Sequence, residues 1–94
     1  DRASLEARSF TVEETSWTFD PPVSGTRVLV QHRAHGERVP ATVEWRDGEC
    51  LVDLGEPVEA VAPGQSAAFY GGDAPDELIG GGVISATVRA DVVA

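Results

Sequence analysis

The sequence predicts an all-β domain of about six strands, arranged as a sandwich or a barrel. Two observations lead to this fold class. No stretch carries the 3.6-residue apolar period of an amphipathic helix over a helical length. Short runs rich in β-branched residues recur instead, separated by Gly, Pro and Asp. The 94 residues form one domain, because two separate cores would each bury too little apolar surface.

The first predicted strand contains Phe10 and Val12, which alternate with polar residues. Trp17 and Phe19 follow and lead to Pro21-Pro22. Because proline cannot donate a ladder hydrogen bond, we expect an edge strand that runs into an irregular loop. Trp17 is a candidate either to stack on a base or to cover one end of the fold.

The next strand runs over residues 27–33, with Val28 and Val30 on one side and Leu29 on the other, and ends at His35-Gly36. Residues 39–54 predict a hairpin, because Asp47-Gly48 supplies the positive φ that a two-residue type I′ turn requires. Counting outward from that turn fixes the register. The face assigned to the core holds Val43, Trp45, Cys50 and Val52.

In the last third of the chain, Ala62-Pro63-Gly64-Gln65 matches a type II turn and leads into a strand over residues 66–70. A loop over 71–76 and a final strand over 78–88 follow. Gly80-Gly81-Gly82 interrupts that strand, which indicates a bulge or a close approach of neighbouring backbone. We place residues 1–8 in a leader, a candidate for disorder, residues 9–88 in the domain and residues 89–94 in a tail.

The composition argues against several classes of binding partner and location. Sixteen acidic residues against seven arginines give a formal charge of −9, which disfavours tight RNA binding by this domain alone and excludes DNA as an expected partner. No run approaches the roughly 18 apolar residues of a membrane span. The lone Cys50 cannot form an internal disulfide or a cysteine-based zinc site, and it fits a cytoplasmic location.

Other groups of polar residues have weaker functional interpretations. His32, His35 and Glu37 are metal-ligand types, but no further Cys or His supports them. Asp73, Asp76 and Glu77 lack the spacing of a calcium loop and predict a solvated surface. Glu13-Glu14 reads as solubilising charge. We expect no cofactor, no metal and no catalytic residue in this chain.

Three stretches then occur in order: Val28-Leu29-Val30-Gln31-His32-Arg33, residues 61–70 with Pro63-Gly64-Gln65-Ser66, and Leu78-Ile79-Gly80-Gly81-Gly82-Val83-Ile84. Together with Glu56-Pro57, they resemble the C-terminal domain of the bacterial tRNA-specific 2-thiouridylase family, also known by the older name tRNA (5-methylaminomethyl-2-thiouridylate)-methyltransferase. The resemblance covers about residues 10–84. It implies a closed or partly closed β-barrel like domain 2 of translation elongation factors.

The resemblance implies that the catalytic steps take place on other domains of such an enzyme. Such an enzyme uses ATP and Mg²⁺ to adenylate the wobble uridine of tRNA, and a cysteine persulfide then delivers sulfur to C2. This chain lacks an S-G-G-x-D-S loop for ATP, and Cys50 on a core face is a poor sulfur carrier. The implied role is accessory: the domain packs against the catalytic and central domains and helps to position tRNA.

The family's tRNA contacts map onto Gln31, His32 and Gln65, and Arg33 is a neighbouring cation that can compensate for a missing arginine. Gln31 and His32 depart from the family's Arg-Tyr pair and have an alternative role as surface residues at a strand end. Gln65 can contact RNA or cap its own turn. Two rival functions stay open: a translation-factor-like protein-interaction barrel, with an exposed apolar patch and Gln31 far from Gln65, and a secreted binding sandwich.

Overall fold

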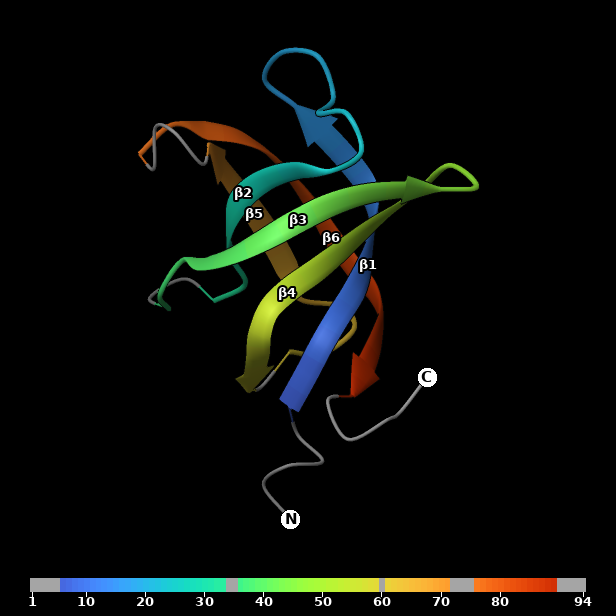
Figure 1. The fold of residues 1–94 in the computed structure, drawn as a ribbon, viewed down its shortest axis with the longest axis vertical. Coiled ribbons are helices and arrows are strands. Elements are labelled where there is room, and N and C mark those ends of the chain that lie inside the picture. Colours follow the sequence, from blue (N-terminus) through green and yellow to red (C-terminus); the bar gives the residue numbers. More distant parts are fainter. Residues whose placement is uncertain (1–5, 34–35, 60, 72–75, 90–94) are drawn as a thin grey trace.

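The computed structural model describes residues 6–33, 36–59, 61–71 and 76–89, and all regular structure in them is β-strand. The six strands are β1 (Glu6–Trp17), β2 (Thr26–Gln31), β3 (Val39–Arg46), β4 (Glu49–Glu59), β5 (Ser66–Gly71) and β6 (Leu78–Arg89). They pair antiparallel in the closed order β1-β4-β3-β2-β5-β6 (Figure 1). The predicted all-β class is confirmed, as is the six-stranded β-barrel that the resemblance implied, and the barrel is closed.

Closure of the barrel corrects the prediction for the first strand. β1 pairs with β4 on one side and with β6 on the other, so it is not an edge strand. The prolines that suggested an edge follow the strand in the loop after Trp17, where they remove no ladder hydrogen bond. A closed barrel leaves no unpaired edge, which removes a template for aggregation.

The ends of the strands also differ from the boundaries drawn on the sequence. β1 begins at Glu6, and Ala7 is buried, so residues 6–8 belong to the barrel and not to a leader. β6 continues to Arg89, which pairs with β1 at Ala7. Residues 1–5 and 90–94, the remainder of the leader and tail, lie outside the described residues. No described helix could cross a membrane.

The hairpin of β3 and β4 forms as predicted. Trp45 lies opposite Cys50, Val43 opposite Val52, and Ala41 opposite Leu54. Asp47 and Gly48 adopt φ values of 51° and 82°, as a type I′ turn requires. The inward face is therefore the predicted one.

One core fills the barrel, and all six strands contribute to it. Phe10 of β1 and Phe69 of β5 are fully buried, as are Val30, Val43 and Val52 from the strands between them. Buried and only partly buried positions alternate along β2, β3 and β5, because successive side chains of a strand point to opposite faces.

Two tryptophans close one end of this core. The Trp17 ring stacks on Phe69, with 5.4 Å between ring centroids, and contacts Trp45 edge-on at 6.0 Å. Trp45 Nε1 donates a hydrogen bond of 2.6 Å to the Pro22 carbonyl. Of the two roles considered for Trp17, the structure therefore supports covering the barrel end, since the ring packs on both Phe69 and Trp45 beside the core.

The three consecutive glycines of β6 let neighbouring strands approach closely, as predicted. A Cβ on Gly80 would lie 2.6 Å from the Ser16 carbonyl oxygen, and one on Gly81 would lie 2.6 Å from the Ala67 carbonyl oxygen. Both distances are too short for any side chain. The pairing of β6 with β1 and with β5 is also irregular here, with register shifts between Glu13 and Ser16 and between Phe69 and Tyr70.

Candidate functional site

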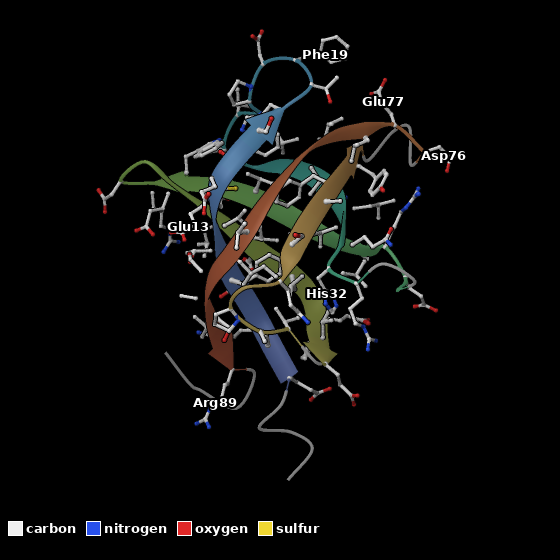
Figure 2. All side chains as sticks on the ribbon, turned by 180° about the vertical axis from the view of Figure 1, so that it is seen from behind. Glu13, Phe19, His32, Asp76, Glu77 and Arg89 are labelled. Atoms are coloured by element: carbon white, nitrogen blue, oxygen red, sulfur yellow. The ribbon has the colours of Figure 1, made fainter. Side chains whose placement is uncertain are left out.

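The residues singled out as tRNA contacts come together at one end of the barrel. Gln31, His32 and Arg33 stand where β2 ends, and Gln65 stands directly before β5, which pairs with β2. All four line one shallow open hollow of about 490 Å³, which we call the β2–β5 hollow. Figure 2 shows His32 toward the same end of the molecule as Arg89, whereas Asp76 and Glu77 lie at the opposite end.

Gln65 is held by the turn that precedes it. Its backbone N–H donates to the Ala62 carbonyl, and Gly64 has a φ of 94°, which together make the predicted type II turn. The side-chain Oε1 of Gln65 accepts a hydrogen bond of 3.0 Å from the Ala62 N–H. The cap that was considered as the alternative to RNA contact is therefore present, and it fixes the amide in the hollow.

Gln31 and Arg33 form the side of the hollow contributed by β2. Gln31 Nε2 donates a hydrogen bond of 2.7 Å to the Arg33 carbonyl, which fixes the chain where it leaves β2. The Arg33 side chain is exposed. Amide and guanidinium groups in such a position can donate hydrogen bonds to phosphate or ribose oxygens.

His32 is buried in the wall of the hollow, so it is not the exposed surface residue that was the alternative to a tRNA contact. Only 8% of it is exposed, and its Nδ1 has no hydrogen-bond partner among the described residues. Every second side chain of this strand points inward, so His32 follows Val28 and Val30 into the barrel.

The protonation state of His32 follows from that burial. Desolvation lowers its pKa below 6.5, and the nearby Arg33 charge lowers it further. A hydrogen bond between the His32 and Gln65 side chains opposes this shift. The imidazole is thus neutral at physiological pH, and it supports Gln65 from beneath rather than supplying a positive charge.

The hollow includes an aromatic residue, Tyr70, that the sequence did not indicate as part of the site. Tyr70 lines the hollow, and the Arg38 guanidinium lies 3.7 Å above its ring centroid. Arg38 also forms an ion pair of 3.3 Å with Asp76. Alternation with the buried Ala67 and Phe69 could have placed Tyr70 on the outer face, but no sequence signal joins Arg38 to it.

Charge is distributed very unevenly around the barrel. The adjacent strands β2, β5 and β6 contain no acidic residue and carry Arg27 and Arg89; we call them the acid-free half. The other three strands, which we call the acidic half, carry two arginines and eight carboxylates, namely Glu6, Glu13, Glu14, Glu44, Glu49, Asp53, Glu56 and Glu59. The β2–β5 hollow belongs to the acid-free half, and no acidic side chain lines it.

The metal-ligand residue types do not gather into one site within the described ranges. No group of three or more His, Cys, Asp or Glu side chains gathers in the described ranges, and His35 and Asp73 lie outside them. The Gly80–Gly82 segment lies within a strand against β1 and β5, so it presents no phosphate-binding loop. Burial raises the pKa of Cys50 to about 11, which opposes formation of the thiolate that sulfur transfer requires.

Comparison with known proteins agrees with this architecture. The family described as "Aminomethyltransferase beta-barrel domain" matches residues 7–84. The tRNA-specific 2-thiouridylase MnmA of Chloroflexus aurantiacus is 45% identical over 85 residues, covering 88% of this chain and 23% of that protein. The MnmA of Acidothermus cellulolyticus is 43% identical over 76 residues, covering 81% of this chain and 20% of the relative.

A further relative carries the same domain in a longer protein. The bifunctional protein NifU/MnmA of Rubrobacter xylanophilus is 44% identical over 84 residues, covering 89% of this chain and 16% of that protein. The chain thus spans less than a quarter of the length of these relatives. It belongs to the aminomethyltransferase beta-barrel domain family and corresponds to the C-terminal domain of the tRNA-specific 2-thiouridylases.

Proposed function

We propose that this chain is an accessory domain that helps to position tRNA, while other domains of a cytoplasmic 2-thiouridylase perform ATP- and Mg²⁺-dependent sulfur transfer to C2 of the wobble uridine. The observation that carries this proposal is the β2–β5 hollow. It gathers Gln31, Arg33 and Gln65 on the acid-free half of a domain whose formal charge is −9. A surface clear of carboxylates is where such a domain can approach a polyanion.

Each residue has a distinct part in this proposal. Arg33 offers a charge-assisted contact to a phosphate, and the amides of Gln31 and Gln65 contact phosphate or ribose. His32 holds Gln65 in place from the buried side. These contacts orient the RNA and carry no sequence information of their own.

The proposal expects the isolated domain to bind tRNA weakly. Few cations face the RNA, so little counterion release drives association, and dissociation constants near 10⁻⁴ M, about those of weak non-specific binding, are expected. Most of the affinity then resides in the catalytic and central domains, against which this domain packs. Submicromolar binding that is insensitive to salt would contradict an accessory role.

The test compares two arginines on opposite halves of the barrel. Arg33→Ala should weaken binding to an unmodified tRNA transcript about fivefold at low salt and lower the salt slope by about one, as loss of one phosphate contact does. Arg46→Ala removes the same charge from β3 of the acidic half and is the matched control. Equal effects of both variants would mean that only net charge matters, and the proposed site would fail.

A protein-interaction barrel without an RNA role is the alternative. Under that alternative, Gln31 and Gln65 should lie far apart, whereas both line one hollow. Phe19, Val23 and Leu78 are exposed apolar residues, and Phe19 lies at the end of the barrel away from His32 (Figure 2). The shared hollow therefore favours the tRNA role.

A further inference from the structure

A second hollow adjoins the β2–β5 hollow along β5. It measures about 530 Å³ and lies over Gly80–Gly82 of β6, between β5 and the end of β1. Ser66, Ala67 and Ala68 line both hollows, so the two are continuous across β5. We call the second one the glycine hollow.

One row of paired residues crosses both hollows. Gln31 of β2 pairs with Ala68 of β5, Ala68 pairs with Gly81 of β6, and Gly81 pairs with Ser16 of β1. Cross-strand partners present their side chains on the same face of a sheet. Between Gln31 and Ser16, the outer surface of this row thus holds only a methyl group and a glycine.

We propose that the glycine hollow is a second RNA subsite, which takes the sugar–phosphate backbone of a strand that continues from the β2–β5 hollow. This inference rests on the proposed function and extends its surface. Four neighbouring strands span about 14 Å at roughly 4.8 Å per spacing, which matches about four steps of roughly 3.4 Å between successive nucleotides. Small side chains let a backbone lie close to the sheet.

The chemistry of the glycine hollow suits a ribose–phosphate chain. The exposed Ser16 and Ser66 offer hydroxyl groups, which donate to phosphate oxygens and can accept from a ribose 2′-hydroxyl. β5 and β6 contribute no carboxylate to it. Trp17 lines the glycine hollow while one face of its ring stacks on Phe69.

One carboxylate marks the limit of the subsite. Glu14 is the only charged residue among the described residues that line the glycine hollow, and it has a φ of 53°. It sits on β1, where the acidic half begins. Its charge should oppose a phosphate near Ser16, so its removal should tighten binding.

The experiment maps binding on the 94-residue chain by NMR, which detects millimolar affinities. Amide shifts of the ¹⁵N-labelled protein are followed at low salt during titration with an unmodified tRNA transcript that has a wobble uridine. The expected result is a continuous set of shifts at Gln31, Gln65, Ala68, Gly81 and Ser16. A DNA duplex at equal phosphate concentration is the control, and it should shift these amides less because it lacks the 2′-hydroxyl.

Charge variants test the same subsite by affinity. Ser16→Glu should weaken tRNA binding about fivefold, since a like charge about 4 Å from a phosphate costs about that factor in water. Glu14→Asn should tighten binding severalfold, and asparagine tolerates a positive φ. Glu49→Asn removes the same charge from β4 and should change affinity by less than twofold.

The outcomes separate this inference from the proposed function. If shifts and affinity changes are confined to the β2–β5 hollow and Ser16→Glu has no effect, the second subsite is refuted while the tRNA role stands. If tRNA shifts no amide of the acid-free half, or shifts only the acidic half, both fail. If the acid-free half binds a protein partner and not RNA, tRNA would shift none of its amides.

Discussion

The two halves of the barrel share one core but present opposite surfaces. Inside, Phe10 of the acidic half and Phe69 of the acid-free half are equally buried, in one continuous apolar cluster. Outside, eight strand carboxylates stand on one half and none on the other. The difference shows that the outward residues of a strand can determine what the surface binds while the inward residues maintain the fold. This is possible because inward and outward side chains alternate along the strand and can vary separately.

The largest expected effect tests whether the core is truly shared. Phe10→Ala and Phe69→Ala should each lower the free energy of unfolding by about 3–5 kcal/mol, because each removes a buried ring and leaves a cavity. Urea denaturation followed by tryptophan fluorescence measures both. A large loss for one variant and almost none for the other would mean that the halves are stabilised separately.

A smaller loss is expected where the strands of the acid-free half approach closely. Gly81→Ala should cost about 1–3 kcal/mol, because the new Cβ would meet the Ala67 carbonyl oxygen and force the strands apart. Gly55→Ala on the acidic half is the control, since the nearest atom to its Cβ would be 3.7 Å away. If both variants are equally stable, the glycine segment is not a packing requirement.

The neutral His32 predicts a pH dependence that resides in the acid-free half. Its pKa is lowered in the folded state, so the unfolded chain binds more protons over this range. The stability that this group contributes is present above pH 6.5 and is lost as the pH falls through the lowered pKa. As the pH is lowered from 8 to 5, the urea midpoint of the wild type should therefore fall more steeply than that of His32→Gln. Parallel curves would contradict the burial of the imidazole.

The smallest effect concerns the buried thiol of the acidic half. With a pKa of about 11, Cys50 is on the order of a thousandth ionised at pH 8 and is enclosed by the core. Iodoacetamide should modify the native protein far more slowly than the urea-unfolded protein, as mass spectrometry can follow. Rapid modification under native conditions would show that the β3–β4 hairpin opens readily.

Local patterns were sufficient to predict much of the fold. The Asp47-Gly48 turn and the alternation beside it determined the β3–β4 register, and Pro63-Gly64 determined the turn before β5. Barrel closure was not readable from residues alone, because the pairing of β1 with β6 joins segments far apart in sequence. The edge assignment of β1 failed for that reason.

The candidate site shows a similar division. The resemblance supplied Gln31, His32 and Gln65, and the structure brings them into one hollow with Arg33. The burial of His32 follows from its place in the alternation of β2, two residues after the buried Val30. The continuity from Gln31 through Gly81 to Ser16 needed the strand order, since three separate pairings create it.

The uneven charge of the strands gives the barrel an electric dipole between the acidic half and the acid-free half. In the field of a polyanion, such a dipole experiences a torque before any atom touches, within a screening length of about 8 Å at physiological salt. The acidic half is repelled and turns outward, so encounters begin with the acid-free half already facing the polyanion. The uneven charge can in this way orient the domain as it approaches a polyanion, even though its total charge is negative.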